Sequence, residues 1–467
     1  MNTIPSFSKK IFFIVWGICF SFSIASGQST YTEYFMRSSF TKMYLNPAKR
    51  PERGFIGIPG LTNIQVGYKT NTFGLDNFLF PGLGENGKSA WFMNENVSYD
   101  RFMQGISEQN YLNLDFAYTP VGFGFYIKDL YLTFDAGLKF NADLNIPGDF
   151  FKFLKKGIPL GEDGEGETYD FSDIGIGEDV YAETGIGASY PFLDKTLVLG
   201  AKVKLLWGMT SAQLNIDRMI FNAGKHSWTL STLASAHIVG IPASYDDENK
   251  FDGLNSDDLS IGVNGFGVGF DLGATFTPKN TGLTFSAALT DIGSIEWDDR
   301  YVTYLATDPN DIVITGNHSI SGDDIANSLS DIVDNLADDF AEAFALKEDP
   351  DAVRNKTTTE LTTQLNVGLE YALLNNKMNV GVLSATHFNP MKTVTEFTFA
   401  GAYRPSGGVE LGLSYSFMHS QFKTFGMALH LGPLYIAGDY IVPHFNSNFI
   451  PTTMRAFNIQ FGFVVPI

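Results

Sequence analysis

An unbroken alternation of apolar and polar residues over residues 130–146 is the feature that most constrains this sequence. Even positions from Leu132 to Ile146 are apolar, whereas odd positions are polar, charged, Tyr or Gly and include Asp135 and Lys139. Because successive side chains of a strand point to opposite faces, the run predicts one long two-faced strand. A globular strand usually has about 5–6 residues, whereas a strand of a membrane barrel needs ~9–11 tilted residues. The run therefore favours a transmembrane β-barrel, with its apolar face towards lipid and its polar face towards the lumen.

The same alternation recurs along the chain. Lys202, Lys204 and Asp271 stand on the polar faces of two such segments, among small residues. Pro, Gly and Asn separate the segments, as expected for tight connections. The clearest examples are 196–208, 265–276, 408–418 and 457–467.

We predict an all-β fold, an antiparallel transmembrane barrel of about sixteen strands, with 14–18 as the accepted range. The predicted strands are 110–118, 120–127, 130–146, 179–190, 196–208, 211–221, 226–238, 261–276, 282–296, 361–373, 377–387, 393–404, 408–418, 421–431, 433–443 and 454–467.

Composition excludes several other classes of protein. Charged residues make up 18% of the chain and the net charge is −20, so no basic surface for nucleic acid is expected. Aromatic residues make up 14%, which argues against disorder. The single cysteine, Cys19, excludes a disulfide scaffold and a Cys-based zinc site.

The first residues have the form of a secretory signal. Lys9 and Lys10 precede an apolar run, 11–24, which is followed by Ala25-Ser26-Gly27. The run is shorter than the ~20 residues of a spanning helix, so we predict a signal peptide over 1–27 with cleavage near Gly27. No later run reaches 18 apolar residues, so we expect no transmembrane helix after the signal peptide. An exported chain with long two-faced strands and no such helix predicts a location in the cell outer membrane.

The long connections 147–178, 239–260 and 297–360 all fall on one side of the predicted barrel, the outer side. Residues 297–360 hold 15 acids and 4 bases. Apolar residues at helical spacing predict a short helix over 325–344 in this loop. Two interpretations stay open: a lid or partner-binding helix, or a helix whose apolar stripe packs on the rim of the barrel.

Catalytic and metal-binding motifs are absent from the sequence. It contains no GxSxG, HExxH or Walker motif, and its seven histidines lack ligand spacing. The acidic segments 161–179 and 245–258 lack the Asp-x-Asp-x-Asp-Gly order of a calcium loop, so we interpret them as solvated loops. We predict neither an enzyme nor a bound cofactor or metal.

Charged residues on the polar faces are the candidate lumen groups. A tight turn after Tyr190 pairs 179–190 with 196–208, which brings Glu183 towards Lys202 and Lys204. We predict a side-chain contact between Glu183 and at least one of these lysines. Two interpretations of this contact stay open: a structural ion pair or a selectivity filter. The lumen-facing candidates are Asp135, Lys139, Glu183, Lys202, Lys204 and Asp271.

The last strand has the form of an assembly signal. Gln460-x-Gly462-x-x-Val465-x-Ile467 has the polar-x-Gly-x-x-apolar-x-apolar form that the outer-membrane assembly machinery binds, although the usual signal ends in an aromatic residue. The alternative is an amphipathic closing strand without this role.

Several short motifs resemble known barrel families. Asn46-Pro47-Ala48 resembles the Asn-Pro-Ala element in the hatch of FadL-like outer-membrane proteins, which include long-chain fatty-acid transporters and PorV-type barrels of a secretion system. Three further segments resemble a barrel family of unknown function. The resemblance implies that residues 28–109 contain an N-terminal hatch and first wall elements, and that 110–467 form the barrel. The three segments are Ile58-Pro59-Gly60-Leu61-Thr62-Asn63, Leu289-Thr290-Asp291-Ile292-Gly293-Ser294-Ile295-x-Trp297 and Leu431-Gly432-Pro433.

These observations lead to three functional hypotheses. The first is passage of a small or hydrophobic solute across the outer membrane. The second is a scaffold or shuttle for surface or secreted proteins, and the third is a general diffusion porin, which a plugging hatch disfavours. The expected partners are outer-membrane lipid, the assembly machinery, and a hydrophobic solute or a surface protein.

Overall fold

The computed structural model describes most of the chain after residue 29. Its described ranges are 30–157, 166–224, 227–247, 249–254, 262–307, 311–315, 345–349, 357–388, 393–418, 422–441 and 454–467. The predicted signal peptide, its cleavage site and the predicted helix at 325–344 lie outside these ranges.

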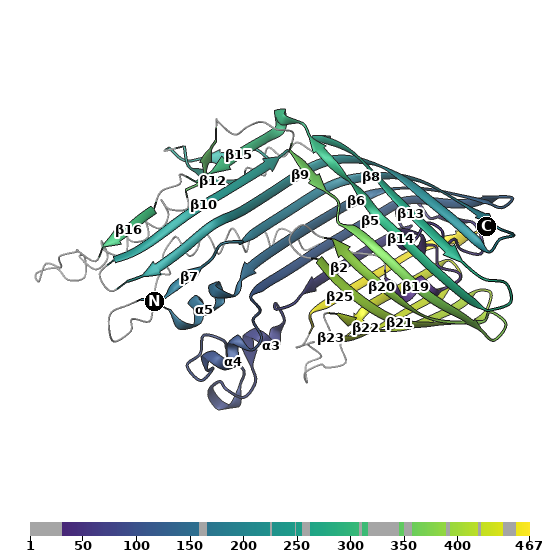
Figure 1. Cartoon of the computed structure of the whole chain (residues 1–467), viewed down its shortest axis with the longest axis horizontal. Coiled ribbons are helices and arrows are strands. Elements are labelled where there is room, and N and C mark those ends of the chain that lie inside the picture. The colour runs from purple at the N-terminus through teal and green to yellow at the C-terminus, as the bar shows by residue number, and fades with distance from the viewer. Residues whose placement is uncertain are drawn as a thin grey trace, which may run out of the picture.

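Fourteen antiparallel strands form a closed ring (Figure 1), so the predicted barrel is confirmed. The first strand of the ring pairs with both the second strand and the last strand, and these pairings close the ring. β1 (Phe55–Gly57) also pairs with the last and the second strand of the ring, beside the last residues of the chain, Val464 to Pro466. In ring order the strands are β2 (Asn63–Thr70), β5 (Gln109–Ile127), β6 (Leu130–Pro147), β8 (Gly175–Phe192), β9 (Leu197–Ala223), β13 (Gly265–Phe276), β14 (Leu283–Trp297), β19 (Thr363–Leu373), β20 (Met378–Phe388), β21 (Thr393–Ser406), β22 (Val409–Met418), β23 (Phe422–Leu431), β24 (Leu434–Ile441) and β25 (Ala456–Pro466).

The predicted total of sixteen changes for four reasons. The ranges 110–118 and 120–127 form the single strand β5, because the chain passes Pro120 with a register shift instead of a turn. The ranges 196–208 and 211–221 likewise form the single strand β9.

The range 226–238 corresponds to β10 (Ser227–Val239), which pairs with the far half of β9 and stays outside the ring. β2 was not among the sixteen predicted strands, because its eight residues lie within 28–109, the stretch assigned to the hatch and the first wall elements without individual strands. The resulting fourteen strands fall at the lower limit of the predicted range.

The outer face of the ring is apolar and exposed. Ile186 on β8 and Leu413 on β22 are each 61% exposed, and similar side chains recur around the wall. Their strand neighbours Gly187 and Ser414 face inward and are buried. A polar interior inside an apolar exterior is the pattern of a barrel surrounded by lipid. None of the helices in the described ranges is long and apolar enough to cross a bilayer.

The wall is much taller on one side than on the other. β9 has 27 residues, whereas β24 on the opposite side has eight. The tall strands extend away from the end that holds the C-terminus and the short turns (Figure 1). The long connections leave from this tall end, as predicted. Around it lie β7 (Thr168–Asp170), β11 (Ala243–Tyr245), β12 (Phe251–Leu254), η4 (Asp299–Tyr301), β15 (Val302–Ala306), β16 (Asp311–Thr315), β17 (Lys347–Glu348) and β18 (Thr358–Glu360).

Residues 71–108 form a small module between β2 and β5. Its aromatic side chains pack with α5 (Gly148–Lys156), which ends at Gly157, where φ is +70°, a value that glycine adopts more readily than other residues. Phe92 and Phe102 stack with their ring centroids 4.6 Å apart. The module contains α3 (Leu75–Phe78), β3 (Leu79–Phe80), η2 (Glu85–Gly87), β4 (Ala90–Trp91) and α4 (Tyr99–Met103).

Candidate functional site

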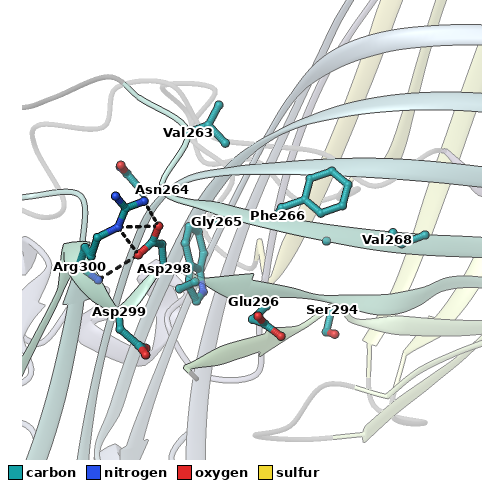
Figure 2. A pocket seen from close by; sticks show the side chains of 12 residues that line it. Val263, Asn264, Gly265, Phe266, Val268, Ser294, Glu296, Asp298, Asp299 and Arg300 are labelled. Carbon is teal, nitrogen blue, oxygen red and sulfur yellow. Dashed lines mark hydrogen bonds and ion pairs between the residues drawn. The ribbon is translucent and has the colours of Figure 1, made fainter. Parts of the chain in front are cut away.

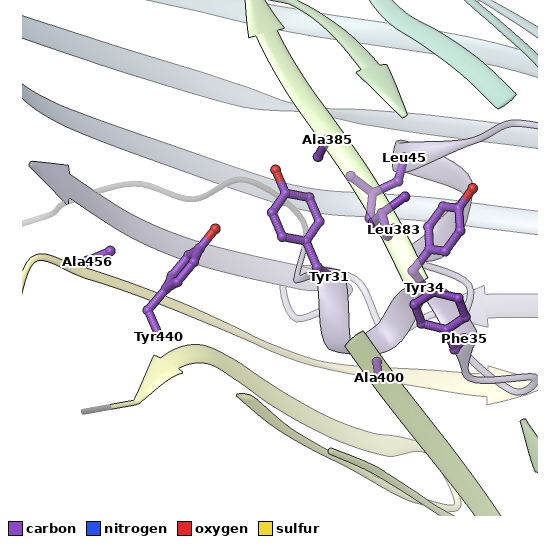
Figure 3. Close-up of a cluster of buried hydrophobic side chains, with 9 residues drawn as sticks. All are labelled: Tyr31, Tyr34, Phe35, Leu45, Leu383, Ala385, Ala400, Tyr440 and Ala456. Atoms are coloured by element: carbon purple, nitrogen blue, oxygen red, sulfur yellow. The ribbon is translucent and has the colours of Figure 1, made fainter. Parts of the chain in front are cut away.

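Residues 30–50, here called the N-terminal segment, fill part of the barrel interior. They include η1 (Tyr31–Phe35) and α2 (Lys42–Leu45). Tyr31, Tyr34 and Phe35 are at most 1% exposed and pack with side chains of β20, β21 and β24 (Figure 3). An eight-stranded barrel is filled by its own side chains, whereas barrels of about 16–18 strands leave a channel. A fourteen-stranded ring therefore leaves a space that this segment occupies in part.

Buried polar contacts fix the segment to the wall. The backbone N–H of Tyr31 donates to Asp439 at 2.5 Å. Glu33 contacts His430 Nε2 at 2.6 Å, and both side chains are buried. The ammonium of Lys49 pairs with Glu370 at 2.5 Å. These wall residues come from three different strands, β24, β23 and β19, so the contacts hold the segment on more than one side.

Lys42 of the segment forms no ion pair with a carboxylate among the residues that the structure describes. Lys42 Nζ donates to the carbonyl oxygens of Met36 at 2.8 Å and Arg37 at 3.1 Å. Burial lowers the pKa of this ammonium to about 8. The segment therefore carries a buried charge whose stabilisation depends on the local backbone.

The Asn46-Pro47-Ala48 element lies against two glycines of the wall. Gly200 on β9 and Gly273 on β13 are direct cross-strand partners. A Cβ at Gly200 would come within 2.4 Å of the Pro47 carbonyl carbon, and one at Gly273 within 2.1 Å of Asn46 Oδ1. Asn46 Oδ1 also accepts a hydrogen bond from the Ala48 N–H at 2.9 Å. The element thus packs on the wall at a site where only glycines fit.

Replacing Gly200 by leucine is expected to displace the segment, since overpacking a close contact costs roughly 1–3 kcal/mol. Lys42 and Lys49 are both 8% exposed, and their displacement opens them to trypsin. Limited proteolysis of the folded barrel checks this. Gly407→Leu is the matched control, because a Cβ there meets nothing within 4 Å. Equal cleavage of both variants would contradict the packing role of Gly200.

The predicted contact of Glu183 is present with Lys202. Lys202 Nζ lies 3.1 Å from Glu183 Oε1 and 2.8 Å from Asp135 Oδ1, and all three side chains are buried. Gly185 makes room, because a Cβ there would lie 2.1 Å from Lys202 Cε. The register differs slightly from the prediction: the hairpin turn lies at residues 193–196 instead of directly after Tyr190, which sets Glu183 opposite Leu206.

Lys204 forms a second cluster on the same wall. Its Nζ lies 2.6 Å from both Asp271 and Asp291. Asp291 occupies a bulge of β14 with φ +57°, a conformation that Asp tolerates better than most residues. Its N–H donates to Asp271 at 2.8 Å. Two lysines thus face four carboxylates, and the pairing leaves an excess of negative charge.

A cavity of about 610 Å³ lies between these clusters and the N-terminal segment. Tyr44 and Leu45 of the segment contribute to its lining. The lining includes seven acidic side chains and four lysines, of which Lys139 is one. Of the predicted lumen residues, Asp135, Lys139, Glu183, Lys202 and Lys204 line this cavity, and Asp271 is buried beside Lys204.

A second cavity, of about 890 Å³, lies where β13 begins and β14 ends (Figure 2). Phe266, which is 46% exposed, and Glu296 lie on its wall. Asp298 is held by Arg300, whose Nε lies 3.0 Å from Asp298 Oδ1. The hydrogen bonds from Arg300 lower the pKa of Asp298 to about 2. The cavity is thus an open groove whose one cation is already paired.

Sequence reasoning missed several lumen residues. Asp115 faces the cavity from β5, but the alternation over 110–118 is less regular than over 130–146. Asp291 was seen only as part of a family motif. His387 and His430 were judged by spacing, which does not reveal contacts with Tyr31 and Glu33. Among the described residues no group of three or more His, Cys, Asp or Glu side chains has metal-binding geometry.

The fold and its apolar outer face define the class of protein, an antiparallel transmembrane β-barrel of the outer-membrane type. The chain belongs to the family described as "Family of unknown function (DUF5723)", which matches residues 47–439. This match confirms the resemblance seen in the sequence. Among curated proteins, no sequence matches the chain.

Solved structures with a similar fold include two toluene transporters. The chain is 9% identical to TbuX of Ralstonia pickettii, with 92% of this chain and 94% of that chain covered and a TM-score of 0.42. It is 10% identical to TodX of Pseudomonas putida, with 94% of each chain covered and a TM-score of 0.35. At these values the likeness gives no information about the solute.

Proposed function

We propose that this protein is an outer-membrane channel that admits a small solute into its lumen. The observation that carries the proposal is the polar cavity of about 610 Å³ enclosed by a lipid-facing ring. Cavities of about 300–1,000 Å³ suit small molecules. The charged lining favours a polar solute over a hydrophobic one, since an apolar molecule leaves these groups without compensation.

In this proposal the N-terminal segment is the hatch. Its polar contacts with Glu370, His430 and Asp439 hold it inside the ring. A general diffusion porin needs a lumen free of such a segment. The hatch moves when solute passes, while the ring stays closed.

A disulfide lock tests the hatch. Thr32 Oγ1 and Ser414 Oγ lie 2.6 Å apart, so Thr32→Cys with Ser414→Cys places two sulfurs within bonding reach. We expect liposomes containing the oxidised variant to stop swelling in the sugar arabinose, and reductant to restore it. Thr32→Cys alone is the control. Equal swelling in both redox states would show that passage does not require the hatch to move.

Residues 1–27 act as the export signal in this account, and β25 presents the assembly signal. Fusing 1–27 to a reporter without a signal, and following its export, tests the first statement. Replacing Gln460 and Gly462 together, and measuring the yield of folded barrel in the outer membrane, tests the second.

A scaffold for surface proteins is the second candidate, and the tall side of the wall favours it. β9 has 27 residues and so spans about 90 Å at ~3.3 Å per residue, against a hydrocarbon core of ~30 Å. Its far half pairs with β10, which pairs in turn with β15 and β16. A barrel that admits no solute in liposomes but co-purifies with a surface protein would support this candidate over the channel.

A further inference from the structure

Most charged groups in the 610 Å³ cavity already have a partner. Lys202 and Lys204 pair with carboxylates, and Asp179 accepts hydrogen bonds from Ser211 at 2.8 Å and Thr359 at 3.2 Å. A charge in a partly enclosed site is costly unless it is paired or hydrogen-bonded. The groups that lack partners therefore indicate what the cavity is built to bind.

Two cavity residues of opposite sign stand out. Asp115 on β5 and Lys139 on β6 each line the cavity and are partly buried. Neither forms a hydrogen bond or an ion pair with any residue that the structure describes, although the charge of Asp115 is attracted by Lys69 and by Lys139. They lie close together, because Ala117 pairs with Lys139 and Asp115 pairs with Asn141 in the ladder between the two strands.

An uncharged donor adds to this pair. Gln65 on β2 is 2% exposed and lines the same cavity, and its Nε2 has no hydrogen-bond partner in the described structure. The cavity thus presents an unpaired carboxylate, an unpaired ammonium and an unpaired amide donor. A molecule that carries an ammonium, a carboxylate and a carbonyl group would satisfy all three.

From this arrangement we infer that the cavity binds a small zwitterion of amino-acid or dipeptide size, with its ammonium on Asp115 and its carboxylate on Lys139. The inference rests on the proposed channel, because it names the solute class of the same lumen. Acidic residues outnumber lysines in the lining, so the cavity attracts the ammonium of the solute more strongly than its carboxylate. Gln65 is a positioning residue that takes a carbonyl oxygen.

Three dipeptide probes of nearly equal size test the inference. L-alanyl-L-alanine carries both charges, its N-acetyl form lacks the ammonium, and its amide form lacks the carboxylate. We expect calorimetry on the full-length barrel in detergent to show binding of the dipeptide. Each blocked form should bind about tenfold more weakly, because each loses one charged hydrogen bond.

Matched variants assign each end of the probe. In Asp115→Asn, N-acetylation should no longer weaken binding, and in Lys139→Gln, amidation should no longer weaken it. Exchanging the two charges, Asp115→Lys with Lys139→Asp, should restore binding of the dipeptide. Asp129→Asn is the control, because this carboxylate lies in an exposed turn and pairs with Lys195. Resistance to heat unfolding on gels verifies that each variant is folded.

The outcomes separate this inference from the channel. Equal binding of all three probes, or no binding of the dipeptide, would overturn the zwitterion site even if liposomes take up arabinose. Dipeptide binding that keeps the expected variant pattern, without flux of any solute, would support the site and overturn the channel.

Discussion

Replacing Lys204 by methionine is expected to be among the most destabilising single changes in the wall. Lys204 is 4% exposed, and its ammonium compensates Asp271, which is 1% exposed. Removing one partner of a buried ion pair leaves an uncompensated charge, at a cost of about 3–5 kcal/mol. The free energy of unfolding, measured by urea titration of the barrel in lipid vesicles, checks this value.

Two controls separate burial from charge. Lys195→Met removes a lysine from an exposed pair with Asp129 and should cost less than about 1 kcal/mol. Adding Asp271→Leu to Lys204→Met should recover most of the loss, because the buried charge then disappears with its partner. A loss for Lys204→Met no larger than that for Lys195→Met would mean that water reaches Asp271.

Deleting residues 30–50 is expected to raise the rate of solute entry into liposomes by about tenfold or more, since a ring of this size leaves an aqueous lumen once its interior is emptied. The wall should still close, because β1 and β2 both follow the deleted residues. Liposome swelling in arabinose measures the change.

Replacing Tyr34 and Phe35 together by alanine keeps the chain length and removes two side chains that pack in the lumen. The rate of solute entry through this double variant should lie between the rates of the deletion variant and the unaltered protein. An unchanged rate after the deletion would show that the N-terminal segment is not what limits entry.

Much of the fold follows from alternation alone. A strand between lipid and a polar lumen has to alternate apolar and polar residues, and the segment from Leu132 to Ile146 shows this alternation. The number of strands is harder to derive, because a bulge keeps the alternation while shifting its phase. Pro120 interrupts the pattern as a turn would, yet β5 continues through it. The sequence does not distinguish these two outcomes.

The lumen site was predictable only where its partners are close in the chain. Glu183 and Lys202 are 19 residues apart and belong to one hairpin, so their contact follows from strand pairing. Glu33 and His430 are 397 residues apart, and their contact exists only once the ring closes. Asp291 reaches Lys204 because a bulge turns its backbone to positive φ, a local event without a periodic signal.

In this barrel the apolar side chains of the ring face lipid and the polar ones face an enclosed lumen. Residues 28–467 contain no cysteine, so single cysteines can carry an environment-sensitive dye at Ile186, Leu413 and Ser414. We predict that brominated lipid quenches the dye at Ile186 and Leu413, on opposite parts of the wall, but not at the adjacent inward position Ser414. Absence of quenching at Ile186 and Leu413 would mean that these faces pack against protein, and would contradict the membrane-spanning barrel.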